Sequence, residues 1–303
     1  MAVITTGSFA KALWPGINAW YGMQYDEHRV EYTDLFKTES SDKAYEEEVA
    51  VSGFGLAPKK AEAAGISYDT ARQLFVKRYT NVTYGLGFII TREMYEDDLY
   101  SVIGKQRSRS LAFSMRQTKE TVAGNIFNRA FNSSYTGGDG VALLSTSHPT
   151  RAGNQSNTLS TAADLSETSL ESILIQISNL KDDRGLRIAS IGTRLIIPSA
   201  YVFTAERLLE STGRVGTADN DINAIRAGGY LPDGYHVMRR ISDSDRWFIK
   251  TDVPDGLKMF TRSPLKKGME GDFETGNVRY KVRERYSFGW TDWRGVFGSE
   301  GAD

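Results

Sequence analysis

The chain has 303 residues, with 37 basic and 38 acidic side chains and a formal net charge of -1. Proteins that grip DNA phosphates usually carry a basic excess, which is absent here. The sequence holds no cysteine, so disulfides and thiolate chemistry are excluded. No apolar run approaches the ~20 residues of a membrane span, and the first eight residues lack the pattern of a signal peptide. We therefore expect a soluble intracellular product with no membrane partner.

Residues 1–37 are predicted to form an arm. The segment is rich in aromatic and aliphatic residues, including Trp20 and Tyr21, but Pro15 and Gly16 interrupt it. A segment this short cannot bury its own aromatic side chains. We expect it to lie on the rest of the chain or on a neighbouring subunit.

Residues 38–90 are predicted to form an extended hairpin. Its limbs, residues 45–54 and 73–84, are strand-like, with β-branched and aromatic residues in the second. A tip of polar and small residues, 55–65, joins them. Both limbs and the tip carry charged side chains: Glu46, Glu47 and Glu48, then Lys59 and Lys60, then Lys77 and Arg78. The hairpin either reaches out to pair with a neighbour or carries ordinary solvated charge.

Residues 91–132 form the longest helical stretch. Thr91 is a suitable N-cap, and a continuous helix of this length would span roughly 60 Å. Its apolar residues change face along the helix, which excludes the fixed seam of a coiled coil. The alternatives are one long helix that touches different partners, or two core helices broken near Gly104. Taken with the rest of the chain, the single helix is the preferred interpretation.

The remainder of the chain combines helices and strands. Residues 164–250 show helical spacing that begins after a capping box of Asp164 and Glu167, followed by alternating short strands and helices. Residues 256–298 return to strands dense in aromatic side chains. The fold class is therefore α+β.

The search for catalytic chemistry finds little. Ser147 precedes His148, but adjacent residues of an extended chain point to opposite faces, so a loop role is preferred over a nucleophile and its base. Two glycine pairs, Gly53 with Gly55 and Gly85 with Gly87, lack the further residues of a phosphate-binding pattern. Asp219 and Asp221 lack the ligand spacing of a calcium-binding loop. We predict no catalytic residue, no cofactor and no metal site.

A basic stretch of the helix is the one feature that suggests nucleic acid. It contains Lys105, Arg107, Arg109, Arg116 and Lys119. Like charges spread around a helix more often mark a solvated or interface face. The exposed arm, the hairpin and the changing helix face together favour an assembly subunit. A hydrolase and a DNA-binding protein remain the alternatives.

Three segments resemble tailed-phage major capsid proteins of the Hong Kong 97-type fold, most closely the Mu-like major head subunits. Residues 138–149, GDGVALLSTSHP, resemble the segment after the spine helix of that family. Residues 195–198, LIIP, resemble its strand-to-helix step. The most specific likeness is residues 280–298, YKVRERYSFGWTDWRGVFG, which are similar to its C-terminal signature.

This resemblance implies a domain plan. Residues 1–37 would be the N-terminal arm and residues 38–90 the E-loop hairpin. The peripheral domain with its spine helix would comprise residues 91–163 and 251–303, and the axial domain residues 164–250.

The resemblance also implies a function. The subunit would assemble with itself into hexamers and pentamers of an icosahedral shell around packaged double-stranded DNA, contacted without sequence specificity. A separate scaffolding protein, a portal protein and a cement protein are the further implied partners. The protein would be located in the capsid of the virion, after synthesis in the host cytoplasm. The residues expected at assembly interfaces are Trp20, Tyr21, Glu46, Glu47, Glu48, Lys59, Lys60, Lys77, Arg78, Arg107 and Arg109.

Overall fold

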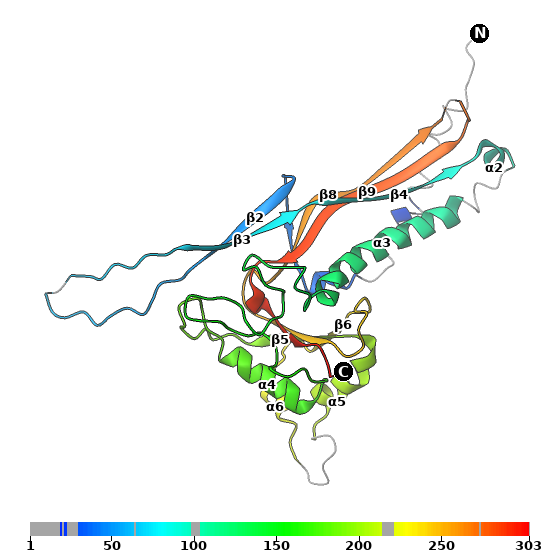
Figure 1. Cartoon of the computed structure of the whole chain (residues 1–303). Coiled ribbons are helices and arrows are strands. Elements are labelled where there is room, and N and C mark those ends of the chain that lie inside the picture. The colour runs from blue at the N-terminus through cyan, green and yellow to red at the C-terminus, as the bar shows by residue number, and fades with distance from the viewer. Residues whose placement is uncertain are drawn as a thin grey trace.

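The computed structural model describes residues 19, 21–22, 30–63, 65–97, 104–213, 221–272 and 274–302. In these ranges two four-stranded sheets and a separate two-stranded hairpin form the framework (Figure 1). The long first sheet extends to the upper right of Figure 1 with helix α3 beside it, and the hairpin extends to the left. The second sheet lies below, with the shorter helices α4, α5 and α6 around it.

The first sheet has the strand order β1-β8-β9-β4. β8 and β9 form a long antiparallel ribbon, β4 pairs antiparallel with β9, and β1 pairs parallel with β8. The strands are β1 (Lys37–Ser40), β4 (Val82–Ile90), β8 (Leu257–Gly271) and β9 (Val278–Trp290). Along β9, buried and exposed residues alternate from Arg279 to Glu284, as expected for a strand with one covered face.

Helix α3 (Lys105–Asn128) is shorter than the predicted helix of residues 91–132. The described residues hold a separate helix α2 (Arg92–Glu96), which ends in a turn at Asp97. The continuous helix was therefore wrong, and the alternative of two helices with a break near Gly104 fits. Thr91 accepts the backbone N–H of Met94 at 3.4 Å, so the predicted cap serves the short helix.

The changing apolar face of α3 is explained by two different partners. Leu111 and Met115 pack with Tyr280 and other residues of the first sheet. Further along, Ala123 and Phe127 belong to a core that reaches both sheets. Gly124 is required at the crossing, because a Cβ there would lie 2.6 Å from the Cβ of Arg240.

The second sheet has the strand order β10-β7-β5-β6. Its elements are α4 (Glu167–Ser178), β5 (Gly192–Ile197), a 3-10 turn η4 (Ser199–Tyr201), α5 (Val202–Glu210), α6 (Ala224–Gly228), β6 (Tyr235–Val237), β7 (Trp247–Thr251), η5 (Trp293–Gly295) and β10 (Val296–Ser299). Because β10 pairs with β7, the last strand belongs to this sheet and not to the first.

The capping box of α4 differs from the predicted one. Ser166 is the N-cap, and its side chain accepts the backbone N–H of Ser169 at 3.2 Å. The Ser169 hydroxyl in turn accepts the backbone N–H of Ser166. Asp164 instead accepts the N–H of Ala302 at 2.9 Å. A serine pair two residues further along thus performs the role predicted for Asp164 and Glu167.

The hairpin consists of β2 (Tyr45–Val51), β3 (Gln73–Thr80) and the connecting residues 52–72. It is shorter than the predicted range 38–90, because β1 and β4 are paired into the first sheet.

The start of the described chain packs on its own subunit. The 3-10 turn η2 (Tyr32–Asp34) leads into Leu35 and Phe36, which are buried in the central core. The Glu120 carboxylate of α3 accepts the backbone N–H groups of Glu31 and Tyr32 at 2.9 and 3.2 Å.

Candidate assembly surface

The charged side chains of the hairpin pair mostly within their own subunit. Glu47 and Arg78 are cross-strand partners and form an ion pair of 2.6 Å. The Arg78 guanidinium also lies 4.3 Å from the ring centre of Tyr45. These two predicted interface residues therefore stabilise the hairpin itself, although both side chains are exposed.

The other limb charges hold the hairpin to the rest of the chain. Glu48 accepts hydrogen bonds from Lys258 and Thr291 of the first sheet and the turn after it. Glu46 accepts the hydroxyl of Ser41 at 2.8 Å. These contacts fix the base of the hairpin, so few of its charges are left for a neighbour.

Lys77 is also held inside the subunit. It donates to the carbonyl of Thr136 at 2.7 Å and lies 4.7 Å from the ring centre of Trp290. Burial lowers the pKa of Lys77, while the nearby Asp139 carboxylate opposes that shift.

The connecting loop leaves apolar side chains exposed instead. Lys59 and Lys60, which we expect at an assembly interface, lie in it and are exposed. Five apolar residues of β2 and the loop form what we call the tip surface: Val51, Phe54, Leu56, Ile66 and Tyr68, exposed by 63, 63, 81, 72 and 94%. We did not predict this surface from the sequence, although apolar residues inside a loop of small and polar residues were a visible signal.

One ion pair connects the hairpin loop to the segment between α4 and β5. Arg184 donates to the Asp69 carboxylate at 2.5 Å and to the carbonyl of Thr70 at 2.6 Å. The backbone N–H of Gly55 also donates to Asp69 at 2.8 Å. The Gly55 hydrogen bond, followed by that from Arg184, lowers the pKa of Asp69 to about 2.

The remaining predicted interface residues divide into three groups. Tyr21 is fully buried, 6.4 Å from Tyr280 between ring centres, so it contacts its own chain. Arg107 and Arg109 are exposed on the first turns of α3. Trp20 lies outside the described residues.

The basic stretch of α3 does not form one face. Arg116 and Lys119 are buried, whereas Arg107 and Arg109 are exposed. Lys119 forms an ion pair with Glu284 of β9, and its Nζ lies 5.0 Å from the ring centre of Tyr286. Only part of the predicted basic stretch is therefore open to a partner.

His148 is a structural residue. It is completely buried, stacks on Trp293 at 4.2 Å between ring centres, and contacts the Asp139 carboxylate at 2.6 Å through Nδ1. Its Nε2 lies 3.0 Å from the side-chain oxygen of Asn157. Ser147 points elsewhere, since its hydroxyl accepts from Asn154 at 2.6 Å. The arrangement gives no nucleophile and base pair, in agreement with the preferred loop role.

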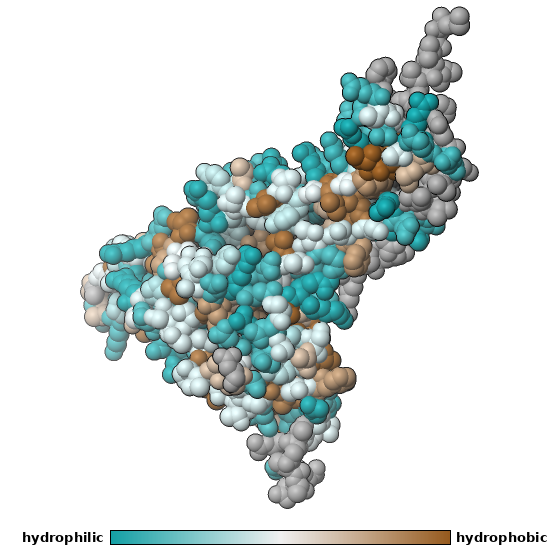
Figure 2. Space-filling model, turned by 45° about the vertical axis from the view of Figure 1, so that its right-hand side comes forward, coloured by the Kyte–Doolittle hydropathy of each residue, from teal (hydrophilic) through white to brown (hydrophobic). Residues whose placement is uncertain are grey.

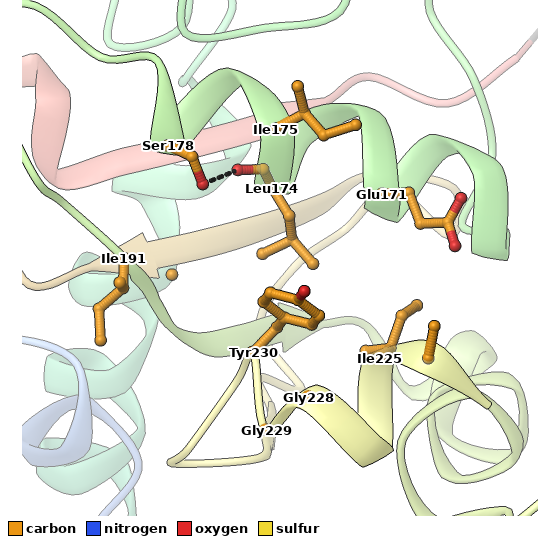
Figure 3. A pocket seen from close by; sticks show the side chains of 11 residues that line it. Glu171, Leu174, Ile175, Ser178, Ile191, Ile225, Gly228, Gly229 and Tyr230 are labelled. Atoms are coloured by element: carbon orange, nitrogen blue, oxygen red, sulfur yellow. Dashed lines mark hydrogen bonds between the residues drawn. The ribbon is translucent and has the colours of Figure 1, made fainter. Parts of the chain in front are cut away.

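An apolar hollow of about 500 Å³ lies between α4, α6 and the start of β5 (Figure 3). Leu174, Ile225 and Tyr230 line it, and Glu171 is the one carboxylate among its lining residues. Among the described residues there is no group of three or more histidine, aspartate or glutamate side chains suited to a metal ion. None of the helices in the described ranges combines the length and apolar character of a membrane span.

The outer surface shows hydrophobic side chains in separate patches among hydrophilic ones (Figure 2). Several exposed apolar residues lie beyond the tip surface, including Ile89 at 58% and Phe113 at 48% exposure. Apolar residues scattered singly over a surface are normal in soluble proteins, so these positions by themselves indicate no interface.

Comparison with known proteins gives the family. The sequence matches the model of a phage capsid protein family over residues 75–298, which is more than half of the chain. A search of curated protein sequences found no significant match.

Solved structures show the fold. The chain superposes on a virus-like particle from Pyrococcus furiosus with a TM-score of 0.55 and 12% identity, covering 93% of this chain and 97% of that one. It superposes on the capsid of a native GTA particle with a TM-score of 0.56 and 11% identity, covering 91% and 92%. The procapsid of bacteriophage JBD30 gives a TM-score of 0.52 and 14% identity, covering 96% and 75%. Together with this shared Hong Kong 97-type fold, the family match shows that the chain belongs to the phage capsid proteins, which are structural proteins and not enzymes.

Proposed function

We propose that the chain is the major capsid subunit and that it assembles with itself into hexamers and pentamers of an icosahedral shell. The shell would enclose packaged double-stranded DNA and form the head of the virion, after synthesis in the host cytoplasm. The family match supports the role of capsid subunit. The narrower likeness to Mu-like head subunits stays a prediction.

The tip surface is the observation that carries this proposal. Its side chains extend from the subunit on a hairpin, and Leu56 and Tyr68 are 81 and 94% exposed. Burying one such apolar side chain contributes about 1.5–3 kcal/mol. A soluble monomer gains nothing from this exposure, whereas a neighbouring subunit that covers the surface converts it into assembly energy.

We revise the proposed domain bounds so that they follow the strand pairing. We assign the E-loop to the hairpin within residues 38–90 and the peripheral domain to the first sheet with α2 and α3. We assign the axial domain to the helices and strands within residues 164–250, together with β10. The described residues that precede β1 continue the N-terminal arm.

Contact with packaged DNA is proposed for the exposed start of α3. Arg107 and Arg109 are exposed there and can neutralise phosphates without reading the base sequence. Charge reversal of both residues should lower retention on duplex DNA at low salt. Unchanged retention would exclude this face as the DNA contact.

Partner proteins complete the proposal. A separate scaffolding protein would guide closure, a portal protein would occupy one vertex, and a cement protein would bind the finished shell. These partners are inferred from the capsid role.

The test is assembly of the full chain, expressed with and without its scaffolding protein. Size-exclusion chromatography and electron microscopy should show capsomers or closed shells. A compact monomer at high concentration under both conditions would overturn the proposal.

A further inference from the structure

A row of cations follows the face of β9 that points away from α3. Tyr280 and Val282 are buried on the α3 side, so the residues between and beyond them point to the opposite face. Four basic residues occupy alternate positions there: Arg279, Lys281, Arg283 and Arg285. Lys266 of β8 is directly opposite Arg283. We call these five residues the cation stripe.

The centre of the cation stripe lacks internal compensation. Lys266 and Arg283 are like charges on directly opposed positions, an arrangement that destabilises a sheet. Within the described part of the chain, Lys266, Lys281 and Arg283 have no carboxylate at ion-pair distance, whereas Arg279 binds Asp272 at 2.7 Å. The repulsion between these like charges therefore destabilises the sheet, and a bound external anion would reduce that repulsion.

Glycines border the stripe on both neighbouring strands. Gly85 of β4 is opposite Arg283, and Lys281 lies between Gly87 of β4 and Gly268 of β8. Gly87 must be a glycine, because a Cβ there would lie 2.5 Å from the carbonyl oxygen of Tyr280. The four cations of β9 therefore form one row, with Lys266 of β8 beside Arg283, and the glycines on both sides of Lys281 let a ligand approach the row closely.

We propose that the cation stripe binds an extended acidic segment of a partner protein. Alternate residues of a strand are about 6.6 Å apart, so a second extended chain with carboxylates at every second position matches the row in spacing and sign. Arginine and carboxylate form paired, charge-assisted hydrogen bonds, and arginine clusters are a recurring means of recognising acidic motifs.

A second copy of this chain is a poorer occupant. Its alternating carboxylates on β2, Glu46 and Glu48, are already bonded to Ser41 and Lys258. Asp272 is paired with Arg279. Since these carboxylates are already bonded within the subunit, β2 of a second copy offers no free alternating pair, and we assign the acidic segment to a different protein.

Duplex DNA also fits less well. A duplex presents two phosphate strands across a groove about 6 or 12 Å wide, and a single row of cations meets only one of them. The glycines beside Lys281 leave no second row of basic side chains. This face is also separate from the α3 face proposed above for DNA.

The test measures peptide binding to the full chain by fluorescence anisotropy. The probe is a labelled peptide of about eight residues with glutamate at every second position and threonine between, which spans the roughly 20 Å of the stripe. The control peptide has the same composition with its glutamates in one block. Lys281→Gln with Arg283→Gln is the test variant. Lys59→Gln with Lys60→Gln removes the same charge from the hairpin loop and is the matched control.

The wild type and the control variant should bind the alternating peptide more tightly than the blocked one. The test variant should lose about tenfold in affinity, which corresponds to ~1.4 kcal/mol, and binding should weaken with added salt. Equal binding by both variants, no preference between the peptides, or stronger competition by duplex DNA would each overturn the proposal. Electron microscopy of the test variant separates this from the capsid role, because its particles should form normally.

Discussion

The tip surface gives the sharpest prediction about assembly. We consider the double change Leu56→Ser and Tyr68→Ser, which removes two apolar side chains from the hairpin loop. Their exposed fractions are 81 and 94%, so neither side chain is buried in the core of its own subunit. The free energy of unfolding of the isolated subunit should therefore change by less than ~0.5 kcal/mol.

The effect on assembly should be much larger. If a neighbour covers both side chains, their loss removes about 3–6 kcal/mol from each subunit contact, at about 1.5–3 kcal/mol for each apolar side chain. At ~1.4 kcal/mol per tenfold change, the contact weakens by roughly a hundredfold to ten-thousandfold. The subunit concentration needed for half-maximal assembly should rise accordingly.

Light scattering against subunit concentration measures assembly, and urea unfolding measures the subunit. Lys59→Gln with Lys60→Gln is the matched variant, since it changes charge in the same loop and keeps the apolar side chains. Assembly of the double serine variant at wild-type concentrations would refute the reasoning. A defect confined to the lysine variant would instead support the charged interface predicted from the sequence.

Three further predictions test contacts in other parts of the subunit and at the base of the hairpin loop. Lys119→Met should lower the free energy of unfolding measured in urea by about 3–5 kcal/mol, because it removes the buried ion pair between Lys119 and Glu284. His148→Ala should destabilise the subunit by roughly 2–4 kcal/mol through lost hydrogen bonds and stacking, while no chemical activity is expected to change. The pKa of Asp69 is lowered from 3.8 to about 2, so its contact with Arg184 should persist at pH 4 and be lost as the pH falls through about 2. A carboxyl titration of Asp69 followed by NMR checks this, and an ordinary pKa would contradict the contact.

The strand pattern was readable from the sequence because its cause is local. Residues 280–284 alternate between buried and exposed in β9 as a strand with one covered face requires. The C-terminal aromatic residues pack in the core, as Trp290 does. These features depend on neighbouring residues along the chain, which a sequence displays.

The limits of the helix could not be read in the same way. Thr91 was correctly identified as a cap, but the helix it begins ends at Glu96. Strong helix formers dominate after Gly104 and no proline interrupts residues 91–132, so the sequence shows no clear stop between the two helices. The position of α3 is set by contacts far away in sequence, such as Gly124 against Arg240.

Whether a charged side chain is buried or exposed also depends on residues far away in the sequence. Arg107 and Lys119 look alike in the basic stretch, yet the first is exposed and the second is buried against Glu284. The partner of Glu48 is Lys258, more than two hundred residues away. A sequence gives the sign of each charge, but only the fold decides which charges remain free.

In the hairpin, charged side chains of the limbs pair within the subunit, whereas apolar side chains of the loop are exposed to solvent. Its limb charges close ion pairs inside the subunit, as Glu47 does with Arg78, while Phe54 and Tyr68 stay exposed. Exposed ion pairs contribute only ~0–1 kcal/mol, less than the burial of one large apolar side chain. In the proposed assembly, the apolar tip contributes the larger energy, and it does so only when a neighbouring subunit excludes water from it.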